Sequence, residues 1–402
     1  MKVKKMPLER DQKLAKDKVL SWLAAPRGKQ VFRIFGYAGT GKTYVVEDII
    51  EDYDGEVLFA TPTGKAAEVL TMSGCPASTV HSLIYIPVPP NLARYKELEA
   101  RYEKAKPSEA ASIKNEMSEC TKLRWRINSN SDLVDADLLV LDEVSMLNDK
   151  VTRDLLSFGK PTLVLGDPGQ LPPISGCGTL TQATPDVMFT EIHRQAKDNP
   201  IIMLSFKARM NLPLPRGSFG SSRVMEFYDV KERDFIEADQ IVTGKNNTRR
   251  NINQAVRQSL GFSGQMPKVG EKVICLRNHK EIGIFNGSQG IVTRIVEEFG
   301  DSIRAEIDME SGISINTLMH RAHFQEYDTP GHVKSLPFNT MRYADEFDFG
   351  YAVTVYKAMG SQWKSNLVYD DNFLTWKPID RARWLYTGIT RAIEATTVVL
   401  GG

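Results

Sequence analysis

Four short apolar runs in the first half of the chain each end abruptly in polar residues. They are VFRIF at 31–35, VLFA at 57–60, LLVL at 138–141 and TLVL at 162–165. Continuous apolar runs of this length, separated by stretches with helical spacing, predict parallel strands that are buried on both faces. Ligands of such sheets bind at the carboxyl ends of the strands. We therefore expect one ligand-binding α/β lobe over residues 1–195, with its chemistry on the polar segments.

The first polar segment, GYAGTGKT, has the spacing G-x4-G-K-T between an apolar run and a helical pattern. This is the context of a P-loop, whose glycines let backbone N–H groups surround phosphate oxygens at the positive end of a helix. Lys42 can then reach the β- and γ-phosphates, and the Thr43 hydroxyl can bind Mg²⁺. The residues predicted to hold the nucleotide here are Gly36, Gly39, Thr40, Gly41, Lys42 and Thr43.

Two other polar segments carry candidate catalytic side chains. Asp142 and Glu143 follow the third apolar run, where Asp142 would hold Mg²⁺ and Glu143 would orient and deprotonate an attacking water. The alternative is that both carboxylates cap the next helix, but their place behind a P-loop favours the metal. Gln170 follows the fourth run and is placed to sense the γ-phosphate. Taken alone, GDPGQ would indicate only a turn.

Composition indicates a folded chain of several domains. The 402 residues, of which 25% are charged and 42% hydrophobic, are enough for two or three domains. The net charge of +1 means that nucleic-acid binding would need a local groove. The cysteines are too scattered for a zinc site, and we expect reduced, buried thiols at Cys75, Cys120, Cys177 and Cys275. No apolar run approaches the ~18 residues of a membrane span, so we expect a cytosolic protein.

Two segments interrupt the strand pattern. Residues 87–131 are rich in Ala, Glu and Lys with helical spacing, which predicts two helices separated near Pro107. Trp125 lies there between basic residues, either as a wedge that stacks on a base or packed beneath the helices. Residues 263–346 alternate strand patterns with Gly-rich turns, which predicts a small β-barrel with a tight turn at Asn286 and Gly287.

Eight motifs together resemble superfamily 1B helicases of the RecD/Dda-like branch. In chain order they are GYAGTGKT, ATPTGKAA, TVHSLI, LDEVSM, GDPGQLPP, EIHRQ, TVYKAMGSQW and YTGITRA. The resemblance extends from about Gln12 to the C-terminus. Because no long segment precedes the first motif, the chain is most similar to the compact phage Dda-type helicases.

The resemblance implies an α/β fold of two RecA-like parallel-sheet lobes. Lobe 1A would span 1–195, with 87–131 inserted in the position of the strand-separating pin. Lobe 2A would combine 196–262 and 347–402, with the β-barrel 263–346 inserted as 2B. The strand candidates of lobe 2A are QIVTG, YAVTV, NLVYD and TTVVL.

The resemblance also assigns catalytic residues beyond the first lobe. The second lobe has no P-loop, so it can act on the nucleotide only by reaching across. Arg391 in YTGITRA resembles the arginine finger, and Arg194 in EIHRQ resembles a second γ-phosphate arginine. Gln12 is similar to the adenine-reading glutamine. A structural salt bridge for Arg194 and a place on a helix surface for Gln12 are the alternatives.

Nucleic-acid contacts are implied on both lobes. Hydroxyls and backbone amides contact phosphate without reading sequence, so we expect little base specificity. The chain departs from the family at Tyr356, Met359 and Gly388, where His, Gln and Ala are usual. The predicted contact residues are Thr61, Pro62, Thr63, Lys65, His81, Ser82, Trp125, Thr354, Tyr356, Lys357 and Ser361.

The resulting hypothesis is an ATP-dependent helicase that moves 5′→3′ on single-stranded DNA and uses Mg²⁺. The polarity, and a role in phage or bacterial replication, recombination or repair, come from the resemblance alone. We expect a monomer in the bacterial or infected-cell cytosol that binds single strands and single-strand/duplex junctions. Single-strand-binding and replication proteins are further candidate partners, and no membrane partner is expected. The alternatives are a translocase that barely unwinds and a non-motor binding module with an inactive ATPase core.

Overall fold

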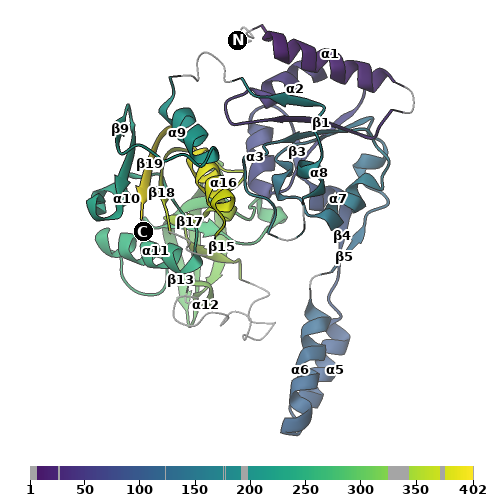
Figure 1. Cartoon of the computed structure of the whole chain (residues 1–402). Helices are drawn as coiled ribbons and strands as arrows, with labels where there is room; N and C mark the ends of the chain where they lie inside the picture. The colour runs from purple at the N-terminus through teal and green to yellow at the C-terminus, as the bar shows by residue number, and fades with distance from the viewer. Residues whose placement is uncertain are drawn as a thin grey trace.

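The computed structural model describes residues 7–25, 28–122, 124–174, 176, 178–191, 198–324, 344–371 and 376–401. These residues form two six-stranded sheets, a five-stranded sheet and a two-stranded ribbon. Figure 1 shows the two large sheets as neighbouring bodies, with a pair of helices projecting away from them. The predicted α/β class with two RecA-like lobes is confirmed. Among the described helices none is both long and apolar enough to cross a membrane.

The sheet of the first lobe has the order β3-β2-β6-β7-β1-β8, with every pairing parallel. The four apolar runs of the sequence form its four central strands. Because β6, β7 and β1 are neighbours, the polar segments that follow them meet at one edge of the sheet. The strands are β1 (Val31–Gly36), β2 (Val57–Thr61), β3 (Ala77–Thr79), β6 (Leu138–Leu141), β7 (Thr162–Gly166) and β8 (Val187–Phe189).

Helices cover this sheet and share its apolar core. Val45, Val46 and Ile49 on one helix pack with Ala15 and Val19 on another, against the inner residues of the strands. The helices and 3₁₀ turns of this lobe are α1 (Arg10–Ala24), α2 (Lys42–Glu51), α3 (Gly64–Met72), α4 (Val80–Ile84), η1 (Asp132–Val134), η2 (Val144–Met146), α7 (Asp149–Leu156) and α8 (Thr179–Gln182).

The insertion in the first lobe is a helical arm on a two-stranded base (Figure 1). Helices α5 (Leu92–Tyr102) and α6 (Pro107–Thr121) pack through Leu98 and Ile113, with Pro107 in the first turn of α6. Both predicted helices are therefore present. The helical spacing did not predict the base of the arm, where β4 (Tyr85–Val88) pairs antiparallel with β5 (Arg124–Ile127). Trp125 lies on β5 and is 43% exposed, so it is not packed beneath the helices.

The sheet of the second lobe has the order β17-β11-β18-β19-β10-β9 and is parallel except between β10 and β9. All four predicted strands are present in it. Its strands are β9 (Gly217–Phe219), β10 (Ser222–Glu226), β11 (Gln240–Thr243), β17 (Ala352–Thr354), β18 (Trp363–Tyr369) and β19 (Ala392–Leu400). Its helices and 3₁₀ turn are α9 (Pro200–Arg209), η4 (Phe227–Asp229), α10 (Glu232–Glu237), α11 (Asn246–Ser259), α15 (Val355–Ala358) and α16 (Pro378–Ile389).

The second insertion is the predicted small β-barrel. Its antiparallel strands follow the order β15-β14-β13-β12-β16, and a bridge between Met319 and Asp345 brings the two edges of the sheet together. The predicted turn at Asn286 is present, since Ser288 N–H donates to the Phe285 carbonyl at 2.9 Å. Its elements are β12 (Lys272–Cys275), η5 (Lys280–Ile282), β13 (Gln289–Phe299), β14 (Ser302–Met309), β15 (Ser314–His320), α12 (Arg321–Phe324) and β16 (Phe347–Phe349).

Candidate nucleotide site and nucleic-acid interface

The P-loop joins β1 to α2 and has the left-handed backbone that its glycines allow. Gly39 has φ 78° and Gly41 has φ 72°, a region that residues with a β-carbon rarely adopt. The Lys42 ammonium donates to the carbonyls of Gly36 (2.8 Å) and Tyr37 (3.2 Å), so it lies inside the curl of the loop. Thr40 is buried, and its hydroxyl also donates to the Tyr37 carbonyl. Hydrogen bonds from Lys42 and Thr40 to loop carbonyls therefore fix the conformation of the P-loop, with the Lys42 ammonium at its centre.

The acidic pair lies at the end of β6, on the same edge of the sheet. Glu143 has a left-handed backbone (φ 54°), and its N–H donates to Asp142 Oδ1 at 2.7 Å. Burial raises the pKa of Asp142 to about 6, with Glu143 adding to the effect and Lys42 opposing it. The next helix, α7, is capped by Asn148 and not by this pair. Asp142 is therefore a half-buried carboxylate whose charge a cation would stabilise.

The segment after β7 contributes Gln170 and a carboxylate that the sequence analysis did not single out. Gln170 is buried, and its side-chain oxygen accepts from the Ser145 hydroxyl at 3.2 Å, just after the acidic pair. Asp167 is also buried, and one of its oxygens accepts from Gly169 N–H at 2.9 Å. Burial raises the pKa of Asp167, while Lys42 acts to lower it. The side chains after β1, β6 and β7 therefore share one electrostatic environment.

Helix α16 of the second lobe reaches this edge of the first lobe through two consecutive residues. The Tyr386 hydroxyl donates to Asp167 Oδ2 at 2.5 Å and accepts from the P-loop N–H of Ala38 at 2.8 Å. The Thr387 hydroxyl accepts from Leu171 N–H at 3.1 Å. We call Tyr386 and Thr387 the docking pair. Sequence reasoning missed both, although they lie inside the YTGITRA motif.

Arg391 follows α16 and is 4% exposed. Its Nε donates to the Thr387 carbonyl at 3.1 Å, and its Nη2 donates to the Thr390 hydroxyl at 3.2 Å. It forms no ion pair with a carboxylate in the part of the chain that the structure describes. Its guanidinium donates to oxygen atoms of the second lobe itself.

The remaining predicted nucleotide contacts lie elsewhere or outside the described residues. Gln12, in the first turn of α1, is only 3% exposed, and its side-chain oxygen accepts from Glu9 N–H at 3.0 Å. The alternative of a surface glutamine was therefore wrong. Arg194 lies outside the residues that the structure describes. A different arginine that sequence reasoning missed, Arg209 on α9, has its guanidinium 3.4 Å above the ring of Tyr37 in the P-loop.

The predicted contact segment of the first lobe, residues 61–65 at the end of β2, lies against the barrel. Thr61 is buried, and its hydroxyl donates to the Thr63 carbonyl at 2.9 Å. Gly64 approaches the barrel so closely that an added β-carbon would lie 2.5 Å from Phe285. Lys65 forms an ion pair with Glu310 of the barrel at 3.6 Å, and Pro62 lies between the two threonines. The structure therefore brings this predicted contact segment together with the barrel insertion.

The predicted contact segment of the second lobe, residues 354–361, also contacts the barrel, at the turn that contains Phe285 and Asn286. The Lys357 ammonium donates to the side-chain oxygen of Asn286, and burial lowers the pKa of this lysine. Asn286 is thus part of a turn and also joins the barrel to the second lobe through Lys357. Ser361 is buried, and Tyr356 is half-buried, which raises its pKa. Thr354 is at the N-cap of α15 without a side-chain capping bond.

His81 and Trp125 form part of an aromatic cluster at the base of the arm. The ring centroids of His81 and Tyr85 are 5.4 Å apart, and those of His81 and Trp125 are 6.3 Å apart. Partial burial and Lys150 lower the pKa of His81. Ser82 donates instead to the Thr79 carbonyl at 2.9 Å within the helix cap. Two of the predicted contact residues, His81 and Trp125, therefore lie side by side, and the Tyr85 ring is close to both.

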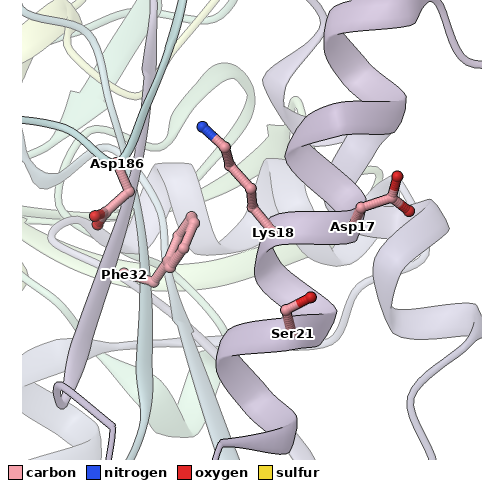
Figure 2. A pocket seen from close by; sticks show the side chains of 5 residues that line it. All are labelled: Asp17, Lys18, Ser21, Phe32 and Asp186. Carbon is pink, nitrogen blue, oxygen red and sulfur yellow. The ribbon is translucent and has the colours of Figure 1, made fainter.

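The described residues contain a pocket away from the P-loop and no metal cluster. These contain no group of three or more His, Cys, Asp or Glu side chains that could hold a metal ion. Figure 2 shows a pocket of about 400 Å³ lined by α1 and β1, with Phe32 at the amino end of β1 and Asp186 beside it. The P-loop follows the opposite end of β1, so this pocket is not the nucleotide site.

The fold and this site define a P-loop nucleotide-binding protein with two RecA-like lobes. A family model described as an AAA domain matches residues 8–211, and one described as a UvrD-like helicase C-terminal domain matches residues 349–399. The chain belongs to this AAA-domain family.

Two curated relatives match almost the whole chain. The ATP-dependent RecD2 DNA helicase of Deinococcus radiodurans is 27% identical over 398 residues, which cover 91% of this chain. The ATP-dependent DNA helicase Pif1 of Campylobacter jejuni is 23% identical over 416 residues, covering 90% of this chain and 87% of the relative. The chain spans only 46% of the length of the RecD2 helicase.

Solved structures of Pif1 helicases share the fold. The Candida albicans Pif1 structure has a TM-score of 0.53 at 15% identity and covers 99% of this chain and 95% of its own. A Pif1 structure solved to explain unwinding at forked duplex DNA has a TM-score of 0.57 at 18% identity, covering 98% and 92%. At these identities the likeness describes the fold.

Proposed function

We propose that this chain is an ATP-dependent DNA helicase that translocates 5′→3′ on single-stranded DNA. The observation that carries the proposal is the docking of α16 of the second lobe on the P-loop and on the loop after β7 of the first. A site shared by two lobes can convert nucleotide turnover into relative movement of those lobes. The names of the RecD2 and Pif1 relatives support the same activity. In this proposal lobe 1A is 1–195, lobe 2A is 196–262 with 347–402, and the barrel is 263–346.

The residues around the P-loop suit ATP hydrolysis. The backbone of Gly39 to Gly41 and the Lys42 ammonium would hold the phosphates, and Glu143 would orient and deprotonate the attacking water. The half-buried Asp142 carboxylate, with its raised pKa, fits a cation. Mg²⁺ held by Asp142 and the Thr43 hydroxyl would neutralise charge on the β- and γ-phosphates. Gln170 and Arg391 would report whether the γ-phosphate is present.

The single-stranded DNA would run along the predicted contact segments of the two lobes, residues 61–65 and 354–361. Both segments contact the barrel turn, which we define as residues 285–288. This turn contacts the first-lobe segment at Gly64 and the second-lobe segment at Lys357. Closing and opening of the lobes would therefore change the distance between two grips on the strand. Alternating tight and loose grips would turn this change into steps.

Strand displacement on DNA duplexes with a 5′ or a 3′ single-stranded overhang tests the proposal. We expect ATP-dependent unwinding of the 5′-overhang duplex and no unwinding of the 3′-overhang duplex. The Lys42→Ala variant should bind the strand but neither hydrolyse ATP nor unwind. Unwinding of only the 3′-overhang duplex would reverse the polarity, and normal unwinding by Lys42→Ala would contradict the P-loop assignment.

A translocase that displaces bound proteins without unwinding is the second candidate function. It would use the same ATP site and the same strand path, and it would not need the helical arm as a wedge. The exposed Trp125 on the ribbon of that arm favours unwinding, because an exposed aromatic ring can stack on a base pair at a junction.

A further inference from the structure

Tyr386 makes its two hydrogen bonds from a fully enclosed position. The side chain is 1% exposed, and its hydroxyl both donates to Asp167 and accepts from Ala38 N–H. The first partner lies 219 residues away in the sequence and the second 348. One phenol oxygen therefore ties the P-loop to the neighbouring loop of the first lobe, from the second lobe.

The fit around the phenol depends on a glycine of the first lobe. A β-carbon added at Gly169 would lie 2.9 Å from the Tyr386 ring and 3.0 Å from the Arg209 side chain. Such distances are shorter than ordinary van der Waals contact, so only glycine lets both side chains approach. On the other side of α16, a β-carbon at Gly388 would lie 3.2 Å from Val368. Close packing on both sides fixes the position of the helix.

Thr387 connects this docking to Arg391. Its hydroxyl accepts from Leu171 N–H of the first lobe, and its carbonyl accepts from Arg391 Nε. The carbonyl is available because α16 ends at Ile389 and the Arg391 backbone N–H bonds to the Gly388 carbonyl instead. The last carbonyls of a helix lack intrahelical partners and can bind side chains. The docking pair therefore contacts the first lobe and orients the guanidinium at once.

We propose that Tyr386 and Thr387 are positioning residues that set the Arg391 guanidinium against the P-loop when the lobes close. This inference rests on the proposed function, in which Arg391 acts on the γ-phosphate. The contacts pass through hydroxyl groups, which water can satisfy once they are exposed, so the contacts can break when the lobes part and re-form when they close. Because a single oxygen serves both partners of Tyr386, parting the lobes removes both bonds together.

The contact also satisfies the buried Asp167 carboxylate. Burial raises the pKa of this group, and the hydrogen bond from Tyr386 acts against that effect. Removing the phenol oxygen would leave one carboxylate oxygen without this donor beside the P-loop. A buried hydrogen bond to a charged group is worth enough to change a rate about tenfold to a hundredfold.

The test is steady-state ATP hydrolysis with saturating single-stranded oligonucleotide. The variants are Tyr386→Phe and Thr387→Val, with Tyr351→Phe as a matched control. Tyr351 is a tyrosine of the second lobe whose hydroxyl accepts from Lys272 N–H at 3.4 Å. We expect Tyr386→Phe to lower kcat about tenfold to a hundredfold while KM for ATP and the melting temperature stay near those of the wild type. The control should hydrolyse ATP like the wild type.

Combining variants separates positioning from a general structural role. Arg391→Lys should lower kcat. Adding Tyr386→Phe to it should cause little further loss of kcat, because both changes impair the same contact, that of the Arg391 guanidinium with the γ-phosphate. A kcat of Tyr386→Phe equal to that of the wild type, or independent losses in the double variant, would overturn the inference. If Tyr386→Phe melts well below the wild type, Thr387→Val takes its place in the same comparison. A wild type without DNA-stimulated hydrolysis would instead contradict the proposed function itself.

Discussion

Lys65 of the first lobe forms an ion pair with Glu310 of the barrel, with Nζ 3.6 Å from Oε2. Glu310 lies beyond the end of β14, and Lys65 is in the first turn of α3. Lys65 is one of the residues predicted to contact the nucleic acid, where its ammonium would bind phosphate. A carboxylate beside it competes for the same ammonium, so this pair links the barrel to strand binding.

Removal of that negative charge should strengthen binding of single-stranded DNA. We expect Glu310→Gln to lower the Kd about twofold to fivefold at low salt, the range of a partly exposed ion pair, with the gain shrinking as salt rises. Fluorescence anisotropy with a labelled oligonucleotide measures it. Glu306→Gln is the matched control, since Glu306 pairs with Arg294 inside the barrel. Weaker binding by Glu310→Gln would indicate that the pair holds the barrel in its binding position.

Loss of the Arg391 guanidinium should remove catalysis and leave nucleotide binding. We expect Arg391→Ala to lower turnover about 10³- to 10⁵-fold, the usual effect of removing an arginine finger, with little change in the Kd for ATP. Single-turnover hydrolysis and binding of a fluorescent ATP analogue measure the two quantities. Arg294→Ala, which changes an exposed arginine of the barrel, serves as the control. Turnover of Arg391→Ala near the wild-type rate would exclude the finger role.

Shortening the helical arm should separate hydrolysis from unwinding. The arm has its own small core of Leu98 and Ile113 and joins the lobe through the ribbon, so replacing residues 92–121 by a short turn should leave the lobe folded. We expect strand displacement to fall at least tenfold, while DNA-stimulated ATP hydrolysis remains. Trp125→Ala in the intact arm tests whether the aromatic ring itself is the wedge. Unchanged unwinding by the shortened chain would favour the translocase.

Thiol reactivity should follow burial. Burial raises the pKa of Cys275 to about 12, so below that pH its thiolate is scarce and alkylation in the native state should be slow. Cys75 and Cys120 are only partly buried and belong to no disulfide, so they should react first at pH 8. Mass spectrometry after timed treatment with iodoacetamide gives the order. Modification of Cys275 as fast as Cys120 would show that the barrel core opens readily.

The same residues show where sequence reasoning about the cysteines succeeded. All four were expected to be buried, which is confirmed for Cys275 and wrong for Cys75 and Cys120, while Cys177 lies outside the described residues. Cys275 lies in a strand pattern, where alternation predicts the buried face. The other two lie near helix ends, where the sequence pattern does not determine which face is covered.

The strand at Arg124–Ile127 could not be predicted from its own sequence. Four residues next to a helical, Lys- and Glu-rich stretch carry little strand signal, and the strand forms because Tyr85–Val88 offers it a partner. The roles of Asp167, Tyr386 and Arg209 were also missed. Each becomes notable only when two segments far apart in the sequence meet, although the GDPGQ and YTGITRA motifs already contain the first two.

By itself the sequence determined the two α/β lobes, the P-loop, the two helices of the arm and the small barrel. These depend on local periodicity, on glycines at fixed spacings and on motif order, all of which can be read along the chain. Only the tertiary structure decided that α16 docks on the P-loop through Tyr386 and on the loop after β7 through Tyr386 and Thr387. It also decided that the barrel turn contacts both lobes. Such contacts depend on where whole lobes come to rest against each other, which the local pattern of either segment does not contain.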